Sequence, residues 1–153
     1  MNSRSISRFT LIICLFFLWP LLVLAQSDPH DVISYTVYLS GENHTPRIDS
    51  PAIGMVTASV HHGVLTLTGS FEGLMGNAIA AHIHRGAVGE NGPVEIDLMV
   101  VTDEDNQRQG SLSVTHTLTS EQLALLQDGM FYVNVHSEAF PPGELRGQLD
   151  GGS

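Results

Sequence analysis

Apolar and polar side chains alternate along most of the chain after residue 31. A period of two places successive side chains on opposite faces of a β-strand, and it is incompatible with amphipathic helices. About eight short segments follow this pattern, separated by residues typical of turns: 31–40, 52–60, 63–71, 78–84, 93–101, 110–118, 130–136 and 144–149. Many short strands with turns between them predict an all-β fold, an antiparallel Greek-key β-sandwich or barrel.

One segment interrupts the alternation. In TSEQLALLQDG, residues 119–129, Thr119 or Ser120 can serve as the N-cap and Gln122 follows Thr119 at the spacing of a capping box. Asp128 and Gly129 provide a stop. The sequence therefore predicts a single short helix packed on the sheet.

The first 25 residues have a different character. MNSRSISR carries Arg4 and Arg8, and an apolar run follows that ends in Val-Leu-Ala at residues 23–25. This order predicts a secretory signal peptide cleaved after Ala25, with a retained membrane anchor as the alternative. We expect a flexible lead-in at residues 26–31 and one domain at residues 32–150. The protein would then be secreted or periplasmic, with no membrane attachment after cleavage.

The chain after residue 25 is strongly acidic. It holds four arginines, no lysine and all 16 acidic residues, a net charge of −12 with neutral histidines. Such a surface repels nucleic acid and anionic lipid. The only cysteine, Cys14, precedes this region, so no disulfide can stabilise the domain and it must fold by burying a core.

Three histidines stand in phase with one another on the predicted strands. His82 and His84 flank Ile83, and His136 alternates with Val135. Since Ile83 and Val135 are expected in the core, the histidines face the other way, outward. Two imidazoles at i and i+2 lie about 6–7 Å apart at the backbone, and a third would complete three nitrogen ligands for a copper or zinc ion. The alternative is three solvated surface histidines.

Other polar residues have structural interpretations. Arg146 is expected to pair with a carboxylate such as Glu144 or Asp97. A functional alternative is that Arg146 steers a small anion toward a metal held by the histidines. His116 shares the phase of Leu112 and is expected to be a half-buried core residue. The glycines at 86, 89 and 92 suit a tight loop and not a phosphate site, because no helix follows them.

Long motifs connect these features to a known family. AAHIHRGAVGENGPVEIDL at 80–98 and LLQDGMFYVNVHSEAFPPGELRGQL at 125–149 resemble the chordin-type domain, with its Ala-His-Ile-His, Tyr-Val-Asn-Val-His and Pro-x-Gly-Glu-x-Arg-Gly motifs. The paired strands of residues 56–80 are also similar to this family, so the resemblance covers residues 32–149. It implies a secreted, mostly β domain. In chordin such domains belong to an extracellular antagonist of a growth factor.

A looser resemblance links the chain to copper–zinc superoxide dismutases. Those enzymes also have a His-x-His strand, a later histidine at a strand end and an arginine near the last strand, which here match His82, His84, His136 and Arg146. The resemblance favours copper over zinc. The metal-bridging histidine, the further zinc ligands and the cysteine pair are missing, so two-metal dismutase chemistry is not expected.

Three functions remain open at this stage. The first is a secreted domain that binds one copper or zinc ion through His82, His84 and His136. The second is a non-enzymatic extracellular module with an unknown protein partner. The third is a dismutase-like redox enzyme. The sequence shows no nucleophile and base arranged for hydrolysis, and on balance we favour a non-enzymatic role.

Overall fold

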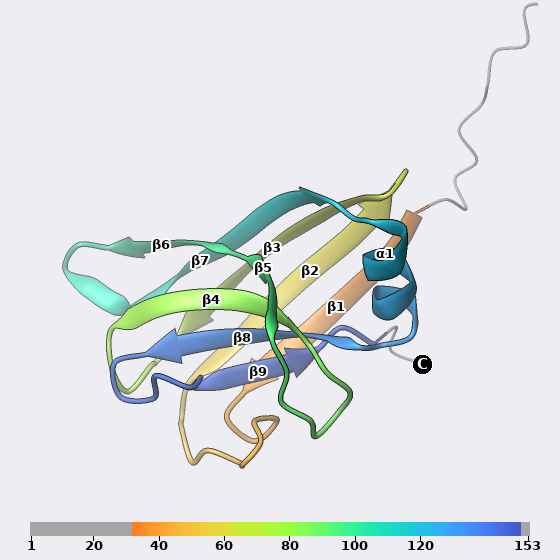
Figure 1. Ribbon diagram of the computed structural model, residues 1–153. Helices are drawn as coiled ribbons and strands as arrows, with labels where there is room; N and C mark the ends of the chain where they lie inside the picture. The colour runs from red at the N-terminus through yellow and green to blue at the C-terminus, as the bar shows by residue number, and fades with distance from the viewer. Residues whose placement is uncertain (1–31, 151–153) are drawn as a thin grey trace, which may run out of the picture.

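The computed structural model describes residues 32–150, which form nine strands and one helix (Figure 1). The predicted signal peptide and lead-in lie outside these residues. All pairings between strands are antiparallel. The elements in chain order are β1 (Val32–Ser40), β2 (Ile53–His61), β3 (Val64–Glu72), β4 (Ala78–Arg85), β5 (Val94–Asp97), β6 (Met99–Asp103), β7 (Asn106–Thr117), α1 (Ser120–Gln127), β8 (Phe131–Ser137) and β9 (Leu145–Gln148).

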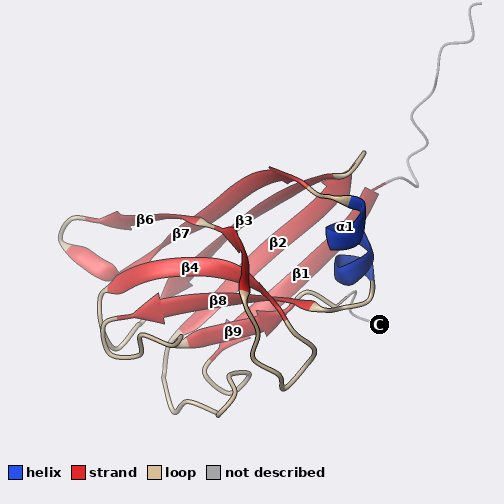
Figure 2. Cartoon of the chain, viewed as in Figure 1, coloured by secondary structure: helices blue, strands red, loops and turns tan. Residues whose placement is uncertain are grey.

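The strands form one sheet that bends back on itself. Its order is β5-β4-β8-β9-β1-β2-β3-β7-β6, and β4, β8 and β9 lie in front of β1, β2, β3 and β7 (Figure 2). The front and back layers are joined at one corner by the single pair Ser40 and Arg146. The all-β prediction is confirmed, as a nearly closed, barrel-like sheet.

The opposite corner lies at Leu98. This residue alone separates β5 and β6, which are the two ends of the sheet order. The N–H of Leu98 donates to the carbonyl of Ala81 at 3.0 Å. The segment 93–101, predicted as one strand, therefore pairs with β4 in its first half and with β7 in its second. This exchange of partner accounts for nine strands where eight were expected.

The core lies between the layers and follows the predicted alternation. On β1 the inward residues Tyr35, Val37 and Leu39 are buried, while the residues between them are exposed. From the front layer, Ile83 and Val133 are fully buried against them. Burial of apolar side chains between the two layers of the sheet is the main stabilising contribution in a domain without disulfides.

The predicted helix is confirmed, and it links β7 to β8 at the right-hand end of the molecule in Figure 2. Thr119 is its N-cap: the threonine side chain accepts from the N–H of Gln122, whose side chain accepts from the N–H of Thr119. Leu126 is the buried residue that anchors the helix. Within residues 32–150, no helix has the length and apolar character needed to cross a membrane.

One residue of β4 does not follow the alternation. The strand period predicts that Ile79 lies on the same inward face as Ile83, but this prediction is wrong, because Ile79 is 53% exposed. The pairing of β4 with β8 shifts between Ala78 and Ala80. Because a β-bulge adds one residue to a strand, it reverses the facing of the residues on one side of it.

Candidate metal centre

The three histidines predicted as ligands come together in the structure. His82 and His84 project from β4 and His136 from the adjacent strand β8. One nitrogen of each lies within 4.8 Å of the other two. The strand register explains this, because Ala80 is the partner of His136 and places it diagonally beside His82.

The cluster is largely buried, unlike the solvated surface histidines that were the alternative to a metal site. His84 is 9% exposed and His136 is 7% exposed, whereas the side chain of His82 retains 22%. Every residue of β8 is buried, including the outward ones. Loops pack over this side of the front layer: the side chain of Asn91, for example, donates to the carbonyl of Thr45 at 2.6 Å.

His84 is held by the glycine-containing loop. Its Nδ1 donates to the carbonyl of Gly92 at 3.0 Å, and its Nε2 is buried with no hydrogen-bond partner among the described residues. The N–H of Gly92 donates to the hydroxyl of Tyr132 at 3.1 Å. A Cβ on residue 92 would collide with the carbonyl oxygen of Arg85, so this loop approaches the strand closely only with glycine there.

His136 and His82 face each other directly. His136 Nδ1 donates to the carbonyl of Pro141 at 2.9 Å, which leaves His136 Nε2 as an acceptor 2.9 Å from His82 Nδ1. His82 Nδ1 therefore carries the proton of this contact. On the other edge of the ring, His82 Nε2 lies 3.7 Å from a carboxylate oxygen of Asp97.

Burial keeps two of the three imidazoles neutral. It lowers the pKa of His136 from 6.5 to about 4, with smaller contributions from His82, His84 and His44, and against the opposing hydrogen bond to Pro141. Burial is also the largest cause of the lowered pKa of His84. Neutral imidazole is the form that binds a metal ion, so both rings offer a nitrogen lone pair at neutral pH.

Arg146 is buried but does not pair with Glu144 or Asp97. Its Nη1 donates to the carbonyl of Glu90 at 2.8 Å and its Nη2 to the carbonyl of Ala87 at 2.9 Å. Asn91 and Gln148 side chains accept further hydrogen bonds from it at 3.3 and 3.2 Å. The expected ion pair was wrong, because the loop supplies enough oxygen atoms to satisfy the guanidinium.

A stacked column connects this arginine to the histidines. The guanidinium carbon of Arg146 lies 3.6 Å from the centre of the Tyr132 ring. Tyr132 in turn stacks on His84, with ring centres 5.1 Å apart and planes 9° apart. Arg146 thus fixes both the loop that bonds His84 and the ring that packs on it.

Glu144 holds further loops in place, as Arg146 holds the loop of residues 87–91. Its side chain is fully buried and accepts from the hydroxyls of Ser50 and Ser137 and from the N–H of Met75. These donors come from three separate parts of the chain. Glu144 therefore ties the loops before β2 and before β4 to the end of β8.

Sequence reasoning missed three residues near the cluster. Tyr132 and Asn134 share the phase of His136, which was their only signal. His44 is 8% exposed, with Nδ1 3.1 Å from the carbonyl of Pro46, and nothing in its sequence context predicted this. His116 lies on β7, away from the cluster, and is half-buried as expected.

Comparisons with known proteins agree with the motif resemblance. The family model for the CHRD domain matches residues 35–149. No curated protein and no solved structure matches the chain. Because the match covers most of the chain, the chain belongs to the CHRD domain family, which supports an extracellular-type module.

Proposed function

We propose that this CHRD domain protein binds one transition metal ion, copper or zinc, through His82, His84 and His136. The observation that carries the proposal is His84 Nε2, a buried nitrogen lone pair with no hydrogen-bond partner in the described part of the chain. Leaving such a group unpaired costs about 1–3 kcal/mol. A metal ion bonded to this nitrogen offsets that cost.

The contacts around the rings suit a metal site. His84 and His136 each donate Nδ1–H to a backbone carbonyl, of Gly92 and Pro141 respectively. Such bonds on the far nitrogen fix the tautomer and the direction of the ligating nitrogen. The ligand atoms are then Nε2 of His84, Nε2 of His136 and Nδ1 of His82.

The donor set favours copper or zinc. Imidazole nitrogen suits both ions, and no carboxylate belongs to the group of three. Three protein ligands leave a further coordination position for water or another small ligand. The partly exposed His82 is the side of the cluster on which solvent can reach that position.

Metal binding requires a proton to move within His82. Without metal, His82 Nδ1–H donates to His136 Nε2. Both of these nitrogens become ligands, so the proton must leave Nδ1 and reside on Nε2, beside the Asp97 carboxylate at 3.7 Å. Asp97 is largely exposed, and we expect it to stabilise this tautomer only modestly.

Metal analysis of the purified protein, prepared without a polyhistidine tag, tests the proposal. We expect about one copper or zinc ion per chain after loading and desalting. Changing His84 or His136 to Ala should weaken binding at least about 100-fold, since a ligand is lost. A matched control is the double variant His61→Ala with His62→Ala. These two exposed histidines lie in the turn between β2 and β3, with ring centres 4.0 Å apart, and do not belong to the cluster.

Two further readouts separate ligation from misfolding. Excess metal should raise the Tm of the wild type and of the hairpin variant but not of the cluster variants, because only a ligand that binds the native state stabilises it. Nitrogen-15 NMR with zinc should show the proton of His82 moving from Nδ1 to Nε2. Retention of full stoichiometry in each of the variants His82→Ala, His84→Ala and His136→Ala would contradict the proposal.

A further inference from the structure

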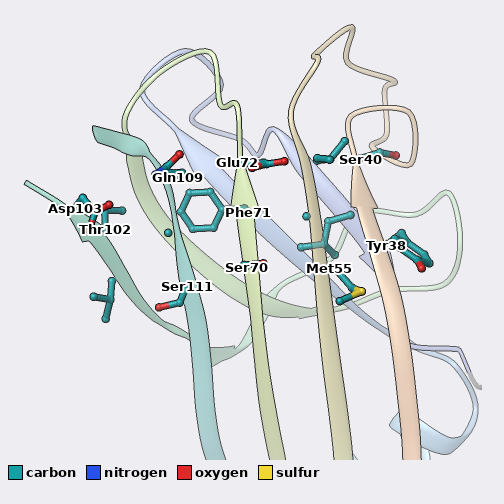
Figure 3. A pocket seen from close by; sticks show the side chains of 15 residues that line it. Tyr38, Ser40, Met55, Ser70, Phe71, Glu72, Thr102, Asp103, Gln109 and Ser111 are labelled. Carbon is teal, nitrogen blue, oxygen red and sulfur yellow. The ribbon is translucent and has the colours of Figure 1, made fainter. Parts of the chain in front are cut away.

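A groove of about 720 Å³ lies on the outer face of the back layer, on strands that carry none of the three histidines (Figure 3). The floor of the groove is a row of residues that lie directly opposite one another on neighbouring strands. The row runs across five strands, from β1 to β6: Tyr38, Met55, Ser70, Ser111 and Val101. Ile53 and Glu72 form the adjacent pair on β2 and β3.

Large apolar side chains are unusually exposed in this groove. Tyr38 is 73% exposed, Ile53 57%, Met55 43% and Val101 55%. Val101 is separated from the other three by Ser70 and Ser111, whereas Tyr38, Ile53 and Met55 adjoin one another on β1 and β2. Single exposed apolar residues are ordinary, but a contiguous group is typical of an interaction surface. Tyr38 and Met55 lie next to each other at one end of the row in Figure 3.

The polar side chains of the groove have unused hydrogen-bonding capacity. Within residues 32–150 the structure records no hydrogen bond from the side chains of Ser70, Ser111, Thr102 or Gln109. These groups sit beside the apolar floor. A bound backbone or side chain can therefore bond to them without displacing an internal contact.

The charge of the groove is entirely negative. Glu72 and Asp103 line it, and no Lys, Arg or His does. In the described part of the chain neither carboxylate has an ion-pair partner, whereas Arg47 pairs with Glu42 and Arg85 with Glu95. Arg108 and Arg146 donate to backbone carbonyls. Arg108 lines the neighbouring depression together with Glu72 but forms no ion pair with it. Both carboxylates can therefore pair with a basic group of another molecule.

We propose that this groove binds a basic, amphipathic segment of a partner protein. An apolar side chain of the segment packs on Tyr38, Ile53 and Met55, and Lys or Arg side chains approach Glu72 and Asp103. Anionic ligands are excluded by the same carboxylates and by the net charge of the domain. The proposal does not depend on metal binding, because the groove and the histidine cluster share no residue.

Selection from a display library of random dodecapeptides on the immobilised protein provides the probe. The most enriched peptide is then synthesised and titrated against groove variants. We expect Glu72→Gln with Asp103→Asn, and separately Met55→Ser, to weaken binding about tenfold. The control is Glu138→Gln with Asp128→Asn, which removes two exposed carboxylates outside the groove and should change the affinity less than about twofold.

We expect the enriched peptides to be rich in Lys or Arg and to carry a bulky apolar residue. We also expect their binding to weaken as salt is added. Neutral or acidic peptides, no enrichment above the empty support, or equal losses in the two double variants would overturn the proposal. Sedimentation of the free protein tests whether a second copy of the chain occupies the groove instead. Dimers that dissociate on Met55→Ser would assign the groove to a second copy of the chain and also overturn it.

Discussion

The two outer faces of this barrel-like sheet follow the same sequence pattern but have opposite environments. On β3, the outward residues Thr66 and Thr68 are exposed. On β8, the outward residues Tyr132, Asn134 and His136 are only 2%, 3% and 7% exposed. Alternation specifies which side of a strand a residue occupies, but the loops that cross that side decide whether it meets water.

The covered face replaces water with backbone groups. His84 bonds to Gly92, His136 to Pro141 and Asn134 to Pro142, in each case through a carbonyl of a loop. Buried polar groups need such partners, because an unpaired one costs more than a hydrogen bond contributes. We therefore expect that replacing a polar residue lowers the free energy of unfolding substantially on the covered face and hardly changes it on the open face.

The largest difference should come from Glu144. Changing it to Ala leaves two hydroxyls and one N–H without their acceptor inside the fold. We expect the free energy of unfolding in urea to fall by about 4 kcal/mol. The exposed Glu138→Ala should change it by less than about 0.5 kcal/mol. A loss below about 1 kcal/mol for Glu144→Ala would show that the covering loops contribute little.

The second effect is the pH dependence of the metal-free protein. The folded pKa of His136 is about 4, against 6.5 ordinarily, so between these values the unfolded chain binds a proton that the folded chain does not. The contribution of neutral His136 to the free energy of unfolding is fully present above pH 6.5. It is lost as the pH falls toward 4, by up to roughly 3 kcal/mol.

Urea unfolding in the presence of a chelator, repeated across this pH range, measures the effect. His136→Gln should show a clearly smaller loss between pH 6.5 and 4, whereas the exposed His62→Gln should behave as the wild type. Identical slopes for His136→Gln and the wild type would mean that His136 is protonated as readily in the folded protein as in the unfolded chain.

A smaller effect is expected from Tyr132→Phe. The change keeps the ring between Arg146 and His84 but removes the oxygen that accepts from the N–H of Gly92. We expect a loss of about 1 kcal/mol in thermal or urea unfolding. Loosening of Gly92 should also weaken metal binding, and an unchanged metal affinity would argue that the loop does not position His84.

The smallest effect should come from the open face. Thr68 lies in the middle of the back layer with its side chain in solvent. Thr68→Ala should change the free energy of unfolding by about 0.5 kcal/mol or less, through β-propensity alone. A loss comparable to that of Tyr132→Phe would remove the distinction between the two faces.

Local patterns were sufficient for the fold class and for several details. The capping box at Thr119 and Gln122 was read correctly because its hydrogen bonds join residues three apart. The turn between β2 and β3 is also local, since it is made by His62 and Gly63 with positive φ angles of 49° and 76°. The grouping of His82, His84 and His136 needed only the strand phase and the adjacency of two strands.

Features that depend on distant segments were not predictable in this way. The bulge that exposes Ile79 depends on the register between β4 and β8. The exchange of partners at Leu98 depends on two strands that meet only when the sheet closes. The partners of Arg146 are loop carbonyls more than 50 positions away along the chain.

The sequence by itself determined that this protein is an all-β CHRD domain with three histidines on one face of two strands. It could do so because side-chain facing follows from the period of a strand. Only the tertiary structure decided that this face is buried, that His84 Nε2 lacks a partner and that Arg146 bonds to a loop. Burial and hydrogen bonding depend on which segments meet in space, and loops carry no periodic signal that tells which face they will cover.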